Sequence, residues 1–211
     1  MLSNVQKLIS IGGPALNSIP VMPASLETTW GEPCGAPLRE LLSKKNGFYA
    51  FEGALHVFPS ESSPQSVGLS DWNHPALWRD CFPGMSPSSV CFAEDIFGVQ
   101  FCIDELGIGT FDPETGDAGR MCGSMEEWAK AILSDYDLWT GHALAREWQL
   151  RHGGLPNGMR LVPIVPFVMG GAFEISNLHL LDAVVGQRMR GEIAAQIRGL
   201  PDGAQVRLVA E

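Results

Sequence analysis

Three apolar segments stand so close together in the sequence that they restrict the fold of the whole chain. Residues 90–93, 99–104 and 109–111 have the length and composition of β-strands. A turn over residues 94–98 joins the first two segments, and a turn over residues 105–108 joins the next pair. Connections this short are what an antiparallel meander requires. The sequence therefore predicts an antiparallel sheet at the centre of the fold.

The chain before these strands is predicted to hold a helix and an extended segment. Leucines spaced i, i+3, i+4 predict a helix over residues 36–45, and Asn46-Gly47 is a typical C-terminal stop. Residues 48–58 are rich in aromatic and β-branched side chains and predict extended chain with a turn in the middle. The long connection over residues 59–89 is expected to contain a short helix around residues 75–81.

After the strands, turn and capping signals predict further helices. Residues 113–117 combine Pro, which presets φ, with Gly, which permits a positive φ, and so predict a turn. Ser124 and Glu127 form a capping-box pattern before an amphipathic stretch that contains Trp128. Gly141 is expected to interrupt the helical region that follows.

The last sixty residues are predicted to form an extension of alternating elements. Residues 173–181 are expected to be extended, residues 183–198 helical, and residues 205–209 a final strand. The helix has an apolar line at every fourth position, and this line is predicted to face the core while Arg188 and Arg190 face away. The members of the apolar line are Val185, Met189, Ile193 and Ile197.

Together these elements predict an α+β fold. A central sheet, antiparallel or mixed, is flanked by helices and followed by a C-terminal strand-helix-strand extension. We expect a single domain over residues 1–211, with its core at about residues 36–135 and the extension at about residues 136–211.

The charge of the chain narrows its range of partners. The formal net charge is −10, which repels nucleic acid and anionic membranes and attracts a basic protein. Residues 80–119 contain eight Asp or Glu and no Lys or Arg. This acidic segment is either a solvated face or a docking surface for a cationic partner. We expect neither nucleic acid nor membrane to be a partner.

The pattern of cysteines and the N-terminal residues predict that the protein is located in the cytoplasm. The five cysteines include no C-x-x-C pair, and the N-terminus lacks a basic region followed by an apolar run. Reduced thiols that act as small core residues are the economical interpretation. The five are Cys34, Cys81, Cys91, Cys102 and Cys122.

A search for catalytic motifs finds none that predicts a reaction. There is no G-x-S-x-G elbow, no H-E-x-x-H helix and no Walker loop, and the five histidines are scattered. Glu94 and Asp95 are adjacent acids whose side chains would point to opposite faces of a strand, so we interpret them as solvated turn residues. The sequence predicts no catalytic residue, no cofactor and no metal ion.

Four stretches of the sequence resemble one known family, the SUKH superfamily. Residues 38–47, a Leu-rich helix that ends at Asn-Gly, lead into the aromatic stretch 48–58 as in that family. Residues 91–104, with the sequence CFAEDIFGVQFCID, are similar to its central hairpin, which has an aromatic-Ala-x-Asp, a Gly turn and a strand ending in Asp. Residues 124–132 with Trp128 resemble the helix that follows.

This resemblance covers about residues 36–135. Residues 139–211, with a Pro-Phe-Val-x-Gly-Gly run at 166–171 and a Leu-Pro-Asp-Gly turn at 200–203, look like an extension seen in some bacterial members. Val99 departs from the pattern, because many members have a polar residue after the hairpin glycine.

The resemblance implies a SUKH-like fold and a non-enzymatic function. The family includes a fungal cell-wall-synthesis regulator and many bacterial immunity proteins that neutralise toxins. The chain is therefore expected to bind a cognate protein toxin, often a nuclease-type enzyme with a basic groove, in the cytoplasm. Two alternatives remain open, a regulatory adaptor of the same fold that binds an endogenous protein, and a hydrolase whose site is assembled from distant residues.

Candidate partner-binding residues come from the acidic segment and from the connection before it. Carboxylates would accelerate encounter with a basic toxin, and a tryptophan of the connection, Trp72 or Trp78, would anchor it unless it belongs to the core. The residues predicted to contact the partner are Asp71, Trp72, Glu94, Asp95, Asp104, Glu105, Asp112 and Glu114.

Overall fold

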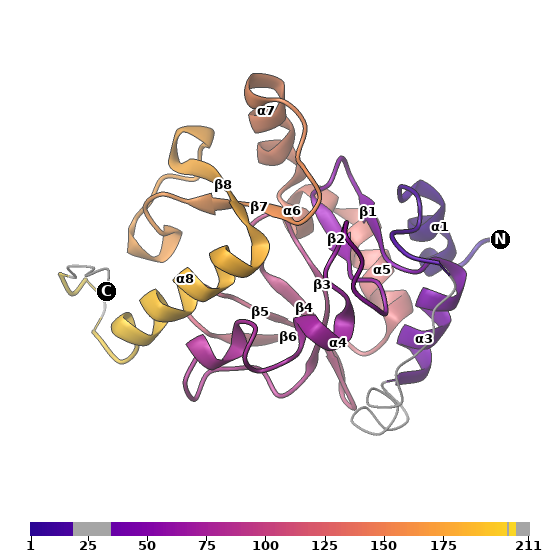
Figure 1. The fold of residues 1–211 in the computed structure, drawn as a ribbon, viewed down its shortest axis with the longest axis horizontal. Helices are drawn as coiled ribbons and strands as arrows, with labels where there is room; N and C mark the ends of the chain where they lie inside the picture. The colour runs from indigo at the N-terminus through magenta and orange to yellow at the C-terminus, as the bar shows by residue number, and fades with distance from the viewer. Residues whose placement is uncertain (19–34, 202, 206–211) are drawn as a thin grey trace.

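The computed structural model describes residues 1–18, 35–201 and 203–205, and the fold is α+β (Figure 1). Six antiparallel strands form one sheet in the order of the sequence, and a second sheet has two strands. The predicted final strand at residues 205–209 falls almost wholly outside the described residues, as does Cys34. The strands of the large sheet are β1 (Phe48–Ala50), β2 (Leu55–Val57), β3 (Val90–Glu94), β4 (Gln100–Asp104), β5 (Gly107–Phe111) and β6 (Ala118–Cys122).

The predicted meander is confirmed, and it is longer than the sequence indicated. Strands β3, β4 and β5 pair antiparallel, with Cys91 opposite Cys102 and Ile103 opposite Ile108. Strand β6 was not predicted, because its sequence, AGRMC, contains no β-branched or aromatic residue. The turn after β5 returns the chain alongside that strand, so Gly119 lies opposite Thr110.

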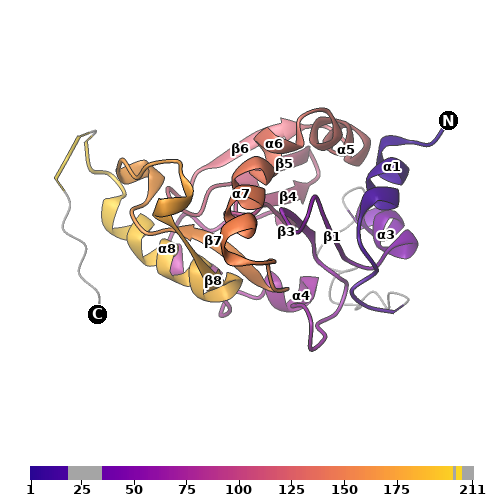
Figure 2. The ribbon, with the colours of Figure 1, turned by 90° about the horizontal axis from the view of Figure 1, so that it is seen from above.

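Helices cover both faces of the large sheet (Figure 2). On one face lies α5 (Met125–Ser134), whose Trp128 ring packs edge-on against Phe92 and Phe101. On the other face lie α4 (Leu69–Trp72) and the 3-10 turn η1 (Arg79–Cys81). Trp72 and Trp78 come from this layer and are buried, so the core interpretation of both tryptophans is correct. The short helix expected around residues 75–81 exists as η1, whereas α4 was missed.

Two N-terminal helices pack at the β1 end of the sheet. Helix α3 (Gly35–Lys44) matches the predicted leucine helix, and α1 (Asn4–Ile11) packs against α5. The Glu126 carboxylate of α5 joins that helix to α1, because it accepts hydrogen bonds from the N–H groups of Asn4 and Val5 at 2.8 and 3.2 Å. A carboxylate at this position also complements the positive end of the α1 dipole.

The C-terminal segment forms a second layer that packs against the turns between β1 and β2 and between β3 and β4, and its last helix lies far from α1 and α3 (Figure 2). Gly141, with φ of 68°, separates its first two helices as predicted, and a Cβ there would lie 2.4 Å from the Phe97 ring. A second hydrophobic cluster joins this layer to the β3–β4 turn and contains Phe97, Trp148 and Leu161. The elements of the layer are α6 (Tyr136–Thr140), α7 (His142–His152), β7 (Met159–Pro163), β8 (Leu178–Asp182) and α8 (Ala183–Ile197).

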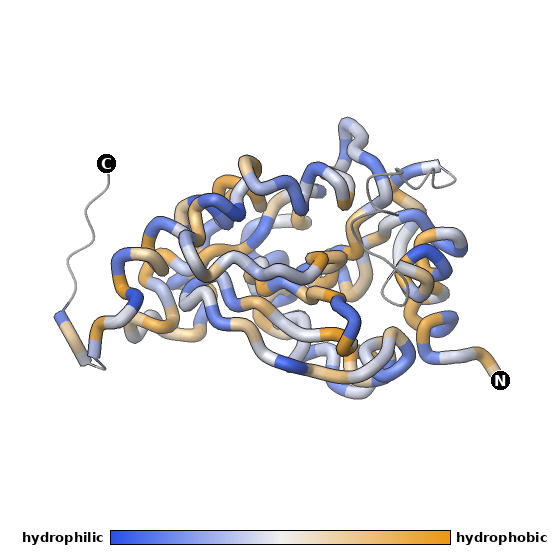
Figure 3. The backbone as a smooth tube through the Cα atoms, turned by 90° about the horizontal axis from the view of Figure 1, so that it is seen from below, coloured by the Kyte–Doolittle hydropathy of each residue, from blue (hydrophilic) through white to orange (hydrophobic). Residues whose placement is uncertain are grey.

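The orientation predicted for α8 is wrong at Val185 and Arg190, although Arg188 is exposed as predicted. Val185, expected in the core, is 51% exposed, and Arg190, expected in solvent, is 3% exposed. The helix instead turns its small residues inwards: a Cβ on Gly191 would lie 2.8 Å from the Cys81 carbonyl oxygen, and one on Gly186 would lie 3.0 Å from Val162. Close backbone approach is thus one cause of the orientation. Figure 3 shows hydrophobic and hydrophilic residues alternating along the helices.

This packing makes Gly191 sensitive to substitution. We expect Gly191→Val to lower the free energy of unfolding by about 2–4 kcal/mol, because the added methyl groups overlap the backbone of η1. Ala195→Val is the matched control, since Ala195 is exposed on the same helix. Urea unfolding of both variants measures the difference. Equal losses in the two variants would contradict the close packing of α8 on η1.

Candidate functional site

The turn between β3 and β4 is a polar region with many hydrogen bonds to other parts of the chain. Glu94, which is 0% exposed, accepts hydrogen bonds from His56 and from Gln100, both at 3.2 Å. The Arg160 Nε atom lies 2.9 Å from the same carboxylate. Asp95 accepts hydrogen bonds from the N–H groups of Phe97 and Val99, both at 2.8 Å. We call residues 94–98 the hub turn.

Strand β7 docks on the hub turn through both backbone and side chain. The Leu161 N–H donates to the Ile96 carbonyl at 2.9 Å, and the Arg160 guanidinium lies 5.5 Å from the centre of the Tyr49 ring. The Tyr49 hydroxyl accepts a hydrogen bond from the Gly158 N–H at 2.9 Å. Arg160 therefore sits between β1 and β3 and ties the C-terminal layer to the large sheet.

Helix α8 docks on the other side of the hub turn. Arg190 donates to the Phe97 carbonyl, and Gln187 donates to the Gly98 carbonyl at 2.6 Å. A Cβ on Gly98, whose φ is 78°, would lie 2.5 Å from the Arg190 Nη2 atom. Glycine is thus required here both for the backbone conformation and for the approach of Arg190.

Burial controls the ionisation of the hub. It lowers the pKa of His56 to about 4, so the imidazole is neutral at pH 7, although the hydrogen bond to Glu94 opposes this effect. It raises the pKa of Asp95 to about 7 against the backbone hydrogen bonds that the carboxylate accepts. Burial alone would raise the pKa of Glu94, but the Arg160 charge and the His56 hydrogen bond lower it.

These groups are inaccessible in this conformation. His56 is 2% exposed, and the carboxylate next to it contacts Arg160 and Gln100. The Trp72 Nε1 atom in turn donates to Gln100 at 2.7 Å. The arrangement combines an acid, a base and a cation, as many active sites do. Glu94, however, has no exposed surface that a substrate could reach. Its chemistry is that of a structural ion pair.

Four of the residues predicted to contact a partner are buried, which corrects the premise of that prediction. Trp72, Glu94, Asp95 and Glu114 have their polar atoms bonded inside the protein, so they do not present a surface. Glu114 accepts a hydrogen bond from the Val168 N–H at 2.9 Å, and burial raises its pKa. The interpretation of Glu94 and Asp95 as solvated turn acids is wrong, because residues remote in sequence cover them.

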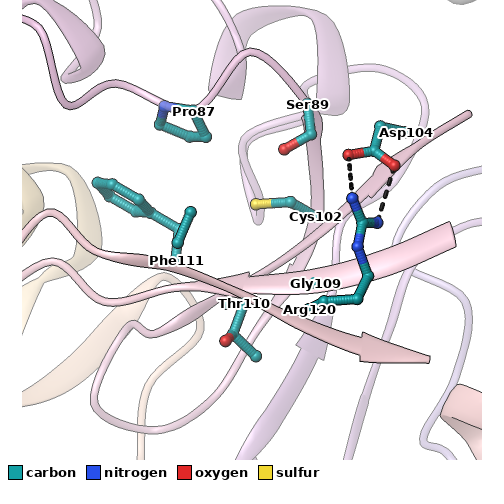
Figure 4. Close-up of a pocket in the computed structure, with 10 residues that line it drawn as sticks. Pro87, Ser89, Cys102, Asp104, Gly109, Thr110, Phe111 and Arg120 are labelled. Atoms are coloured by element: carbon teal, nitrogen blue, oxygen red, sulfur yellow. Dashed lines mark hydrogen bonds and ion pairs between the residues drawn. The ribbon is translucent and has the colours of Figure 1, made fainter. Parts of the chain in front are cut away.

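The other four predicted residues remain accessible, and their role in binding stays a prediction. Glu105 and Asp71 are exposed, and the Asp71 carboxylate accepts a hydrogen bond from Ser62. Asp112 is half-buried and accepts a hydrogen bond from the Glu114 N–H at 2.8 Å. Asp104 forms a two-pronged ion pair with Arg120, at 2.8 and 3.0 Å (Figure 4).

Three of these accessible acids, Asp104, Glu105 and Asp112, lie near strand β6, which is an edge strand of the large sheet. β6 pairs with β5 alone among the described strands, and its residues 118–120 are exposed. Cys122, at one end, pairs with Ile108 beside the turn that carries Glu105, and Ala118, at the other end, pairs with Phe111 beside Asp112. Asp117, exposed and not singled out from the sequence, directly precedes Ala118.

A shallow hollow of about 190 Å³ opens on the sheet beside this edge (Figure 4). Cys102, Gly109 and Phe111 contribute to its floor, and Asp104 and Arg120 form part of its rim. Across residues 1–18, 35–201 and 203–205, no group of three or more His, Cys, Asp or Glu side chains is placed to hold a metal ion. In the same residues no helix combines the length and the apolar character needed to cross a membrane.

Comparison with known proteins identifies the fold but no family. No family model matches the sequence, and no curated protein matches it. The crystal structure of Atu4351 from Agrobacterium tumefaciens is similar, with a TM-score of 0.55 and 13% identity over 91% of this chain and 89% of that chain. At this identity the likeness establishes the shared α+β fold alone.

The Arg160–Glu94 pair should be costly to break on one side only. We expect Arg160→Met to lower the free energy of unfolding by about 3–5 kcal/mol, because the Glu94 carboxylate then remains buried without its cation. The double variant Glu94→Gln/Arg160→Met should recover part of this loss. Urea unfolding of the wild type, the single variants Arg160→Met and Glu94→Gln, and the double variant gives the coupling energy. Additive losses would show that the two side chains stabilise the fold independently.

The two shifted pKa values give opposite pH dependences. Between pH 3.8 and about 7 the folded protein holds a proton on Asp95 that the unfolded chain has lost, so this contribution to stability falls as pH rises. Between about pH 4 and 6.5 the unfolded chain holds a proton on His56 that the folded protein lacks, so this contribution rises with pH. The two contributions oppose each other in the wild-type protein.

Removing one group should therefore expose the other. In Asp95→Asn, which can keep both backbone hydrogen bonds, the free energy of unfolding should rise relative to wild type by on the order of 3 kcal/mol from pH 4 to 7. In His56→Gln the same difference from wild type should fall by a similar amount. Urea unfolding at a series of pH values measures both. Parallel curves for the three proteins would contradict the assigned pKa shifts.

Proposed function

We propose that this protein is a non-enzymatic, cytoplasmic immunity protein of the SUKH kind, which binds and neutralises a basic protein toxin. The observation that carries the proposal is the arrangement of accessible acids around the exposed edge strand β6. Its Ala118 end adjoins Asp112 and Asp117, and its Cys122 end adjoins Glu105. A basic partner is attracted to both ends of one accessible strand.

Edge strands bind other proteins by extending the sheet, which supplies backbone hydrogen bonds. The one cation on β6, Arg120, is neutralised by Asp104, so it does not repel a basic segment. Leu106, which is 72% exposed beside Glu105, supplies an apolar contact at one end of the edge. It takes the anchoring role that the sequence had suggested for Trp72 or Trp78, both of which are buried.

The hub turn is consistent with the same proposal, because its buried acids have a structural role. Glu94 pairs with Arg160 and Asp95 accepts hydrogen bonds from backbone N–H groups, so both acids hold the scaffold rigid. The accessible acids are then the ones available to contact a partner. A preformed surface reduces the entropy lost on binding.

Co-expression tests the function directly. Each protein encoded next to this gene is produced alone and together with this chain, and growth and complex formation are measured. We expect one neighbour to arrest growth alone, and this chain to restore growth and to co-elute with that neighbour. Recovery of an endogenous housekeeping protein in place of a toxin would favour the adaptor alternative. Absence of any complex would contradict the proposal.

Neutralising the acids at the edge should slow binding to the partner. We expect Glu105→Gln/Asp117→Asn to reduce the association rate constant about three- to tenfold at low salt and to flatten its salt dependence. Glu61→Gln/Glu192→Gln is the matched control, because it removes the same charge from exposed positions on other elements. Stopped-flow association at several salt concentrations measures both. Equal slowing in the two variants would show that net charge, and not the β6 edge, determines the encounter.

A further inference from the structure

Two cysteines face each other at the centre of the large sheet. Cys91 on β3 and Cys102 on β4 are directly opposite in the register, and their sulfur atoms lie 3.0 Å apart. Both are free thiols and both are buried. A role as small core residues alone does not account for the contact between the two sulfurs.

The backbone around Cys91 shows which type of strand pair this is. The Cys91 N–H donates to the Asn73 side chain at 2.9 Å, and the Asn73 Nδ2 donates to the Cys91 carbonyl at 2.8 Å. Both backbone groups of Cys91 therefore point away from β4, and Cys91 and Cys102 form a non-hydrogen-bonded pair. In such pairs the Cα atoms are about 4.5 Å apart, which a disulfide can span.

The surroundings of the pair provide access and a cation. Cys102 is 4% exposed and contributes to the 190 Å³ hollow, and Figure 4 shows its sulfur directed into that hollow between Ser89 and Phe111. On the other sulfur, the Arg79 Nη2 atom lies 3.7 Å from Cys91 Sγ. Burial raises the pKa of the neighbouring Cys102 thiol, and the Arg79 charge partly opposes this effect.

We propose that Cys91 and Cys102 are an oxidative modification site, at which a peroxide converts the two thiols into a disulfide across β3 and β4. In the first step the Cys102 sulfur attacks one peroxide oxygen, the O–O bond breaks, and one water leaves with the thiol proton. In the second step the Cys91 sulfur attacks the Cys102 sulfur, the S–O bond breaks, and a second water leaves. Two thiols and one hydrogen peroxide thus give one disulfide and two waters.

The rate of the first step follows from the environment of Cys102. Burial raises the pKa of this thiol, so its thiolate is scarce and oxidation is slow. Once the first sulfur is oxidised the second step is fast, because Cys91 is already in contact with it. The sulfenic acid therefore should not accumulate.

The test uses a variant in which Cys34, Cys81 and Cys122 are replaced by Ser, so that only the pair remains. The folded protein is incubated with hydrogen peroxide and, separately, with oxidised glutathione. We expect intact mass to fall by two hydrogen atoms, thiol titration in denaturant to fall from two thiols to none, and peptide mapping to find Cys91 joined to Cys102. Mapping of the wild-type protein under the same conditions covers the case in which the triple variant folds poorly.

A matched variant separates a disulfide from over-oxidation. Adding Cys91→Ser to the triple variant leaves Cys102 alone, and we expect this protein to gain oxygen in mass without losing hydrogen. If the pair itself only gains oxygen, or keeps two thiols at equilibrium with oxidised glutathione, the proposal is wrong.

The consequence for stability gives an independent measurement. The disulfide should raise Tm by about 5–10 °C, because it restricts the unfolded chain, and a reductant should reverse the rise. The protein with the added Cys91→Ser should show no such rise. A fall in Tm on disulfide formation would mean that the native register does not accommodate the bond, and would overturn the proposal.

Discussion

The buried ion pair between Arg160 and Glu94 is the interaction on which the rest of the structure depends. Removing two charges from water is unfavourable by several kcal/mol for each ion unless each finds partners in the interior. Here the carboxylate has Arg160, His56 and Gln100 around it, and the guanidinium lies against Tyr49 as well. The pair joins β7 to β3, and its surrounding contacts come from β1, β2 and β4, so it couples the C-terminal layer to the large sheet.

The hub turn extends the same coupling to α8 through backbone groups. The carbonyls of Phe97 and Gly98 are bonded by Arg190 and Gln187, and the Ile96 carbonyl is bonded by the Leu161 N–H. Carbonyls in a tight turn have no strand partner, so a buried turn needs donors from elsewhere. The C-terminal layer supplies those donors, which explains why a polar face of α8 points inwards. Hydrophobic periodicity alone could not predict that orientation.

Local signals in the sequence were sufficient for much of the fold. The meander, the leucine helix, the Gly141 interruption and the helix after Ser124 were all predicted from short-range patterns, because turns and caps depend on neighbouring residues. The capping pattern at Ser124 is present, with the Glu127 N–H donating to Ser124, although the Glu127 carboxylate bonds the N–H of Gly123 rather than that of Ser124.

The burial of Glu94 and Asp95 required information that local patterns do not contain. Their partners come from positions about 66 and 95 residues further along the chain, at Arg160 and Arg190, and no spacing rule connects them. Two signals were nevertheless present: an arginine within the otherwise apolar strand MRLVP, and two glycines within the helix that carries Arg190. The first signal marks the buried Arg160, and the second marks the helix whose close packing buries Arg190.

The acidic segment over residues 80–119 contains two groups of carboxylates, one buried and one accessible, which have different roles. The uninterrupted run of negative charge is not one surface, since Glu94, Asp95 and Glu114 maintain the interior. What remains accessible is concentrated near the edge of the sheet. Proteins commonly protect an exposed edge strand with charge, which prevents unwanted pairing. At β6 that charge is negative at both ends, so it disfavours pairing with another acidic strand. Under the proposed function, the same carboxylates would attract a basic partner, so that one set of side chains would serve both purposes.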